Sequence, residues 1–428
     1  MSKLSDYLTV YGYLFKKNSC ANNPKIVNTF IVLLPISVIL FSLISCNKSN
    51  DKFEKYTAIN QDIQKKYAPD KRVAIYDISL IAHQNFLVLK GESDQPKAVE
   101  ELKLELMNND VQIIDSIILL PDASVGNLKY GVINNSVANI RSKPTHAAEL
   151  ATQALLGTGV KVLKKRGSFY LVQVPDGYIS WVDHGGIILM GEGDYLKWNS
   201  AEKVIFTKTV GSVYQEENEN FAVLSDIVLG AQLKYLNKGS DFFKIEYPDK
   251  RIGYIKKGEA QLYDDWIQNV EPSGELLEKY ARDFLGSPYL WGGTSTKGMD
   301  CSGFTKTVYL LNGFIIPRDA SQQIHAGEVV DEHLNFEGLE KGDLMFFGTK
   351  ATDHNEQRVT HVGIWLGNGK GEFIHSASKV RLSSIIPKSK YFDEINKNRY
   401  LGSKRYLGIT DKLITNLKTD KILTDIKP

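Results

Sequence analysis

The chain has 428 residues, and its 52 lysines and arginines nearly balance its 50 aspartates and glutamates, which leaves a net charge of +2. The length predicts three or four domains, and the small net charge provides no basic excess for binding a nucleic-acid backbone. Three cysteines, at positions 20, 46 and 301, are too few for a disulfide-stapled scaffold or a cysteine-rich zinc site.

An apolar run without charges covers residues 26–45 and follows several lysines. This charge order is typical of an export signal. The run ends in Leu43-Ile44-Ser45-Cys46, which resembles the lipobox of bacterial lipoproteins, where the cysteine is lipidated and becomes the mature N-terminus. We therefore predict a signal peptide over residues 1–46, lipidation at Cys46, and an exported lipoprotein at the periplasmic face or outer surface of the cell envelope. An uncleaved transmembrane helix is the alternative, since about 20 apolar residues cross a bilayer.

Residues 47–128 are interpreted as a polar tether followed by a small ββαβ module without identifiable chemistry. Its hydrophobic periodicity predicts three strands and one helix. In the helix, Ala98, Val99, Leu102 and Leu106 fall on one face. The predicted elements are strands at Val73–Ile78, Phe86–Leu89 and Val111–Leu119, and a helix at Pro96–Met107.

An internal repeat follows the module. A series of residues between 156 and 179 recurs without a gap 73 residues later, so that Leu156-Gly157 returns as Leu229-Gly230. A fixed period of this kind indicates two copies of one small fold. Short alternating runs broken by Gly, Pro and Asp are typical of a small β-barrel. We predict two barrels, at residues 129–192 and 193–267, and both resemble bacterial SH3-like barrels.

Cys301 opens a predicted helix, because Phe304, Val308 and Leu311 follow it at helical spacing. A thiol at a helix N-terminus lies near partial positive charge and unpaired N–H groups, which favour the thiolate. A lone cysteine is more often a small buried hydrophobe. A catalytic interpretation of Cys301 therefore requires a base.

Two histidines supply candidates for that base. The runs His361–Leu366 and Glu372–His375 flank a glycine-containing turn and predict an antiparallel hairpin. If Leu366 pairs with Glu372, the two imidazoles are diagonal neighbours on one sheet face. This arrangement suits a cysteine nucleophile, a histidine base and an orienting third group. Two core histidines, or two metal ligands joined by the cysteine, are the alternatives, but no suitably spaced acid completes a metal site, and we expect neither metal nor cofactor.

Six short motifs surround these residues in the last third of the chain. They are Tyr289-Leu290-Trp291-Gly292-Gly293, Asp300-Cys301-Ser302-Gly303-Phe304, Pro317-Arg318-Asp319-Ala320-Ser321-Gln322, Gly342-Asp343-Leu344, His361-Val362-Gly363-Ile364 and Phe373-Ile374-His375-Ser376. Together they resemble the NlpC-type cell-wall endopeptidase family over about residues 275 to 408.

The resemblance implies an α+β, papain-like cysteine peptidase domain that cleaves peptidoglycan stem peptides. It further implies that Cys301 is the nucleophile, His361 the general base and His375 the orienting residue. We assign this domain to residues 275–410 and a solvated tail to 411–428.

The first barrel resembles that of the γ-D-glutamyl-L-diamino acid endopeptidases, with motifs such as Asn139-Ile140-Arg141. The resemblance implies that this barrel closes one end of the groove, where Glu149 and Tyr178 meet the free amino group of an N-terminal L-alanine. At the 73-residue offset Tyr178 becomes Arg251. Only the first barrel is therefore expected to recognise substrate.

Four residues of the catalytic motifs complete the expected binding site: Tyr289, Asp300, Ser302 and Arg318. Asp300 is expected to pair with the substrate ammonium, because charge-assisted hydrogen bonds are strong, and Arg318 to bind a glutamate carboxylate. Structural alternatives remain open. Glu149 and Tyr178 would then be an ordinary loop charge and a barrel aromatic, and Arg318 with its neighbouring aspartate a surface ion pair.

The resemblance implies a cysteine endopeptidase that hydrolyses the bond between γ-D-glutamate and an L-diamino acid, diaminopimelate or lysine, and we expect it to be a monomer. Its substrates would be stem peptides with a free N-terminal L-alanine, produced during cell-wall recycling. Three alternatives stay open: a wall-remodelling hydrolase acting on intact peptidoglycan, a non-catalytic wall-binding protein, and an acyl transferase with the same fold.

Overall fold

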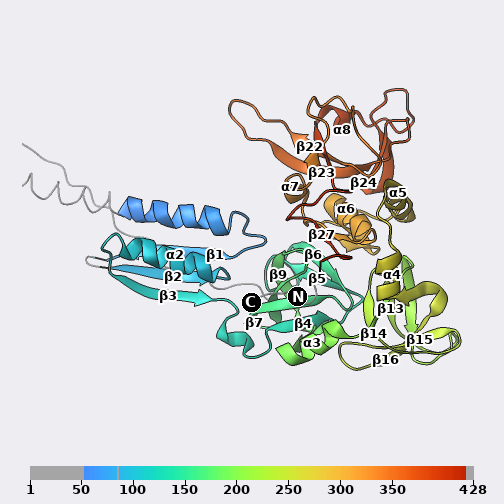
Figure 1. Cartoon of the computed structure of the whole chain (residues 1–428), viewed down its shortest axis with the longest axis horizontal. Helices are drawn as coiled ribbons and strands as arrows, with labels where there is room; N and C mark the ends of the chain where they lie inside the picture. Colours follow the sequence, from blue (N-terminus) through green and yellow to red (C-terminus); the bar gives the residue numbers. More distant parts are fainter. Residues whose placement is uncertain (1–52, 84–85, 421–428) are drawn as a thin grey trace, which may run out of the picture. The chain divides into compact units, whose positions relative to one another are not determined.

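The computed structural model describes residues 53–83 and 86–420, and Figure 1 shows its helices and strands in chain order. The predicted signal peptide, with Cys20 and the lipidation site Cys46, lies outside the described residues. The chain divides after Glu54 into two compact units, and the second unit is the one described below. None of the helices in the described ranges combines the length and apolarity needed to cross a membrane.

The N-terminal module is a three-stranded sheet with the order β1-β2-β3, in which β1 and β2 are antiparallel and β2 and β3 parallel. As predicted, α2 buries Ala98, Val99, Leu102 and Leu106. Part of the expected tether is instead helical, at residues 55–67, where Ile63 is buried. The sheet and its helix comprise β1 Tyr76–Ala82, β2 Leu87–Ser93, α2 Pro96–Met107 and β3 Ile113–Leu119.

The internal repeat is confirmed strand by strand. Each strand of the second barrel begins 73 residues after its counterpart in the first, and the strand orders β10-β4-β7-β8-β9-β5-β6 and β17-β11-β14-β15-β16-β12-β13 are equivalent. The helix α3, Glu192–Ser200, joins the two copies and was not predicted. The first copy comprises β4 Tyr130–Ile133, β5 Val137–Arg141, β6 Leu150–Leu155, β7 Gly159–Arg166, β8 Phe169–Gln173, β9 Ile179–Asp183 and β10 Ile187–Met190; the second comprises β11 Lys203–Phe206, β12 Val210–Tyr214, β13 Val223–Val228, β14 Gln232–Lys238, β15 Phe242–Glu246, β16 Ile252–Lys256 and β17 Ala260–Leu262.

The C-terminal part is built on a six-stranded sheet with the order β21-β26-β22-β23-β24-β25. Helix α6 contributes Phe304 and Val308 to the core that this sheet also lines with Phe346, Val362 and Ile374. Its helices are α4 Tyr263–Asn269, α5 Gly274–Asp283, α6 Cys301–Leu310, α7 Ala320–Gln323 and α8 Glu394–Asn398, and its strands are β18 Thr294–Ser295, β19 Gly298–Met299, β20 Phe314–Ile315, β21 Glu328–Val329, β22 Leu344–Thr349, β23 Arg358–Trp365, β24 Glu372–Ala377, β25 Lys379–Ser384, β26 Tyr400–Arg405 and β27 Thr415–Asn416.

The expectation of a solvated tail from residue 411 is wrong for the described part of that segment. Strand β27 pairs with β20, and Ile414 is only 8% exposed in the main core of the C-terminal part. Isolated apolar residues among lysines and aspartates obscured this packing in the sequence. Residues 411–420 therefore belong to the C-terminal fold.

Ile414→Asp tests this correction. Placing a carboxylate in that apolar position should lower the free energy of unfolding by at least about 2 kcal/mol, measured by calorimetry. Leu413→Asp is the matched control, because Leu413 is 40% exposed and should tolerate the charge. Equal, small effects of the two substitutions would contradict the packed position of Ile414.

Candidate active site

Cys301 is the first residue of α6, as predicted, and Asp300 is its N-cap. The Asp300 carboxylate accepts a hydrogen bond from the Gly303 N–H at 2.7 Å, which satisfies one of the unpaired donors of the helix N-terminus. A Cβ atom on Gly303 would lie 2.0 Å from the Gly293 carbonyl oxygen. Glycine is therefore required where the preceding loop crosses this helix.

The Cys301 thiol is a neutral group in this environment. Burial, with a contribution from the Asp300 charge, raises the pKa of Cys301 to about 12, against the lowering effect of the Val362 and Ser302 N–H groups. The expected thiolate is not supported, because the helix N-terminus does not outweigh desolvation. The thiol therefore needs a base that removes its proton during reaction.

The predicted histidine hairpin is confirmed in its register. Ile364 pairs with Ile374, and the Leu366 N–H donates to the Glu372 carbonyl at 3.0 Å. Continuing this register places Gly363 opposite His375, and a Cβ atom on Gly363 would lie 3.1 Å from the His375 Cβ. The absent side chain thus leaves room for the imidazole.

The two imidazoles are in direct contact. His361 Nε2 and His375 Nδ1 are 2.6 Å apart, and the Val362 N–H next to His361 interacts with the Cys301 thiol. Burial is the main cause that lowers the pKa of His361 to about 4 and the pKa of His375 well below its usual value. Both rings are therefore neutral near pH 7, and Nδ1 is the nitrogen of His361 that does not contact His375.

Two further residues extend this contact and were missed by the sequence analysis. His375 Nε2 lies 2.9 Å from Ser383 Oγ, and Ser383 Oγ donates to Asp393 Oδ2 at 3.1 Å. Because His375 pairs with Arg381, strand alternation places Ser383 on the same face of the sheet. Asp393 is the N-cap of α8, and nothing in the sequence around it predicts that it lies near the histidines.

Asp300 and Arg318 form a buried ion pair. Arg318 Nη2 donates to Asp300 Oδ2 at 2.6 Å and Nη1 to Oδ1 at 3.1 Å, while Nη1 also donates to Ser302 Oγ at 3.0 Å. Arg318 is 1% exposed, so the alternative of a surface ion pair is wrong. The expected pairing of Asp300 with a substrate ammonium is not supported by this arrangement, because Arg318 and the Gly292 and Gly303 N–H groups already surround the carboxylate.

The first barrel packs against the loop that precedes Cys301. Gln153 Oε1 accepts hydrogen bonds from the Thr294 N–H and the Ser295 hydroxyl, both at 3.0 Å. Gly292 has a φ of +78°, and a Cβ atom there would lie 2.1 Å from the Leu150 carbonyl oxygen. The close approach of the two backbones joins this barrel directly to the cysteine loop.

The other predicted binding residues lie at this junction. Glu149 accepts a hydrogen bond from Trp291 Nε1 at 2.5 Å, and the Trp291 side chain is 62% exposed. Tyr178 interacts electrostatically with Asp319 and Arg318, and burial is the main cause that raises its pKa. Burial is likewise the main cause that raises the pKa of Tyr289, and the Tyr289 backbone forms a β-bridge with Met299, two residues before Cys301.

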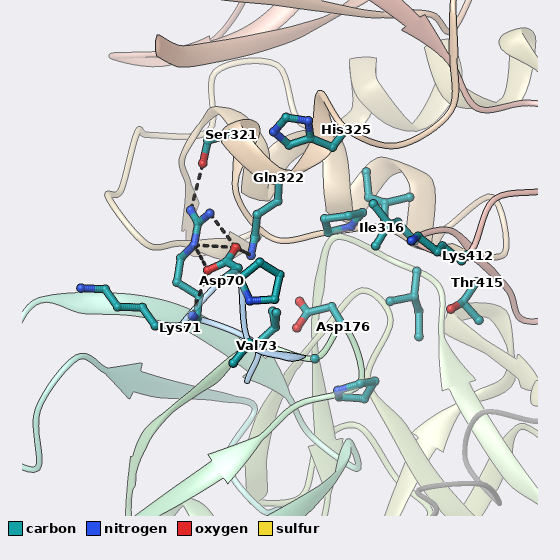
Figure 2. Close-up of a pocket in the computed structure, with 18 of the residues that line it drawn as sticks. Asp70, Lys71, Val73, Asp176, Ile316, Ser321, Gln322, His325, Lys412 and Thr415 are labelled. Carbon is teal, nitrogen blue, oxygen red and sulfur yellow. Dashed lines mark hydrogen bonds and ion pairs between the residues drawn. The ribbon is translucent and has the colours of Figure 1, made fainter. Parts of the chain in front are cut away.

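The N-terminal module reaches the same region. Arg72 donates to Asp319 at 2.7 Å and to Ser321 at 2.9 Å, and Gln322 donates to Asp70 at 2.7 Å. Figure 2 shows Asp70, Ser321 and Gln322 at one side of a cavity of about 1240 Å³. These contacts between the module and the C-terminal part carry no signal in the sequence and were not predicted.

Comparisons with known proteins identify the family of two segments of the chain. Residues 286–404 match the NlpC/P60 family, and residues 140–187 match the bacterial dipeptidyl-peptidase Sh3 domain. A gamma-D-glutamyl-L-lysine dipeptidyl-peptidase from Bacillus cereus is 32% identical over 61% of this chain and 77% of its own length. The protein of the same name from Bacillus subtilis is 28% identical over 55% and 75%. A crystal structure of an NlpC/P60 family protein from Bacillus cereus has a TM-score of 0.55 and 26% identity, covering 65% of this chain and 99% of that one.

Arg318→Leu should leave the Asp300 carboxylate buried without its cation. We expect the free energy of unfolding to fall by about 3 to 5 kcal/mol, measured by urea denaturation, with partial recovery when Asp300→Asn is added. The control is Arg282→Leu, which removes an arginine that is 39% exposed in its ion pair and should cost at most about 1 kcal/mol. Similar losses in the two single variants would contradict the role given to burial.

Proposed function

Because the chain belongs to the NlpC/P60 family of cysteine peptidases, we propose that it hydrolyses the bond between γ-D-glutamate and an L-diamino acid in peptidoglycan stem peptides that carry a free N-terminal L-alanine. The observation that carries the proposal is the direct junction of the first barrel with the cysteine loop through Gln153 and Glu149. A barrel in that position limits how far a substrate extends beyond the bond to be cleaved.

We assign the chemical roles from the geometry of Cys301, His361 and His375. His361 Nδ1 accepts the thiol proton while sulfur attacks the γ-carbonyl carbon, and an acyl-enzyme forms as the C–N bond breaks. The proton on His361 then passes to the leaving amine. A water molecule, deprotonated by the same nitrogen, hydrolyses the thioester. Since the resting thiol and imidazole are both neutral, proton transfer accompanies attack and does not precede it.

The free amino group is proposed to bind at the barrel. Glu149 offers an exposed carboxylate at the N–H edge of the Trp291 indole, and a carboxylate suits an ammonium group because charge-assisted hydrogen bonds are strong. Tyr178 and Tyr289 would line the pocket. Ser302 and Arg318, which are bonded to each other, would organise the wall beneath them. A substrate still attached to its sugar presents a bulky neutral amide at this point.

The names of the two relatives specify lysine as the diamino acid. We propose that this chain accepts either lysine or diaminopimelate. Hydrolysis of intact peptidoglycan remains the competing proposal. It requires a groove that is open at the barrel end.

We propose the domain division predicted from the sequence, with one change. The signal peptide and the module occupy residues 1–46 and 47–128, and the two SH3-like barrels residues 129–192 and 193–267. The papain-like domain begins at residue 275, and it extends past residue 410 because β27 pairs with β20.

Cys301→Ala should abolish hydrolysis while the protein stays folded, because the thiol carries the covalent chemistry and contributes little packing. We expect a loss of more than about 10³-fold in kcat, measured by chromatography of the products. His361→Ala should be similarly severe and His375→Ala milder, since an orienting group does not itself transfer the proton. Turnover by Cys301→Ala would eliminate the mechanism.

A substrate panel tests the specificity. Free L-Ala-γ-D-Glu-L-Lys and its diaminopimelate counterpart should be cleaved, and intact sacculi should release no stem peptides. Glu149→Ala should lower kcat/KM for the free peptides by about 10- to 100-fold, as for a lost charged hydrogen bond. The control is Arg251→Ala in the second barrel, where Arg251 pairs with Asp249, and it should change little. Efficient digestion of sacculi by the unmodified protein would favour the wall-remodelling alternative.

The proposed anchor is tested by Cys46→Ser in the full-length chain. We expect the variant to lose labelling by a fatty-acid analogue and to leave the membrane fraction or stay unprocessed, because acyl chains supply the buried methylene groups that hold a lipoprotein to the bilayer. Membrane binding of an unlabelled wild-type protein would support an uncleaved helix instead.

A further inference from the structure

We propose that Ser383 and Asp393 are positioning residues that fix which ring nitrogens of His375 and His361 carry protons, and thereby direct the unprotonated nitrogen of His361 toward the Cys301 thiol. The inference rests on the proposed function for its catalytic meaning. Its structural part concerns only which atom donates and which atom accepts in each hydrogen bond.

The four groups form one buried line. His375 is fully buried, Ser383 is 1% exposed, and the Asp393 side chain is 9% exposed. Each ring nitrogen of His375 has a partner, His361 at 2.6 Å and Ser383 at 2.9 Å. Asp393 Oδ2 lies 3.9 Å from His375 Nε2, too far for a direct hydrogen bond. The hydroxyl of Ser383 is therefore the link between carboxylate and imidazole.

The direction of the line is set at Asp393. Although burial acts to raise it, the pKa of Asp393 is lowered by the backbone and side-chain N–H groups of Asn396 and by Ser383. An ionised carboxylate only accepts hydrogen bonds, so the Ser383 hydroxyl donates to it. The remaining lone pairs of that oxygen must then accept a proton from His375 Nε2.

Each further hydrogen bond must likewise join one donor to one acceptor, and this fixes the proton on both imidazoles. A neutral imidazole has one N–H and one acceptor nitrogen. If His375 carries its proton on Nε2, its Nδ1 accepts from His361 Nε2. His361 then has its lone pair on Nδ1, the nitrogen left for the thiol. One fixed carboxylate thus sets the proton position on two rings.

Other charged groups near the pair do not set this direction. Arg381, Arg399 and Asp300 act on His361 only through their charges. Arg381, whose side chain is 47% exposed, pairs with Asp393 Oδ2 at 3.5 Å, so it favours the ionised carboxylate and does not contact either imidazole. Without the Ser383 oxygen, His375 is free to hold its proton on Nδ1. His361 would then carry its own proton on Nδ1, facing the thiol, which is the wrong arrangement for a base.

The test compares Ser383→Ala with Ser383→Thr, which keeps a hydroxyl. Ser384→Ala is the matched control, because Ser384 is also fully buried in β25 but its hydroxyl donates to the Lys370 carbonyl. Three readouts are used: kcat and KM on the free tripeptide, the rate of Cys301 alkylation by iodoacetamide against pH, and the nitrogen-15 spectrum of the histidines. The last two need no substrate.

Ser383→Ala should lower kcat by at least about 10-fold with little change in KM. Removing a group that hydrogen-bonds to and orients a metal-binding histidine has effects of this size. Alkylation near pH 7 should slow by a similar factor, and the spectrum of His361 should change from one protonated at Nε2 to a mixture. Ser383→Thr should restore all three readouts, and Ser384→Ala should alter none.

Asp393→Asn provides a second variant if Ser383→Ala does not fold. Asparagine is an equally good N-cap, and its amide allows the line of hydrogen bonds to reverse, so the same three changes are expected. Wild-type alkylation and an unchanged His361 spectrum in these variants would overturn the inference, as would equal losses in Ser384→Ala. If the spectra change as expected but the wild type cleaves no tripeptide, the proposed function fails and the positioning role stands.

Discussion

The arrangement of the active site depends on the hydrogen bonds and the ion pair of the buried Arg318 guanidinium. An arginine cannot lose its proton inside a protein, so each of its donors must find an acceptor. Its partners are Asp300, Ser302 and, through Nε at 3.1 Å, Thr152 of the first barrel. Asp300 in turn caps the helix that begins with Cys301. The charge of Arg318 therefore fixes the positions of the Asp300 cap, the N-terminus of α6 and the first barrel relative to one another.

Burial also determines the chemistry of the reacting groups. It raises the pKa of the Cys301 thiol and lowers the pKa of His361, which disfavours a preformed ion pair and supports the proposed general-base mechanism. For such a mechanism the position of a single proton matters more than net charge. The hydroxyl of Ser383 and the carboxylate of Asp393 provide that control at the far side of the histidine pair.

Local periodicity and repeats predicted a large part of the molecule. The 73-residue repeat gave the second barrel, and the pairing of Leu366 with Glu372 gave the contact between the two imidazoles, because strand register is a local property. The burial of Arg318 was not predictable in this way, since its partners come from other segments. The same holds for Asp393 and for Ile414, whose surroundings are assembled only by the fold.

The proposed mechanism requires that Cys301 carries an L-Ala-γ-D-Glu acyl group during turnover. The most direct measurement is cleavage of L-Ala-γ-D-Glu-L-Lys in the presence of hydroxylamine, followed by mass spectrometry of the products. An acyl-enzyme divides between water and hydroxylamine, so we expect the γ-hydroxamate of L-Ala-D-Glu, in a proportion that rises with hydroxylamine concentration, and none with Cys301→Ala. Formation of the free acid alone at every hydroxylamine concentration would rule out an acyl group on Cys301.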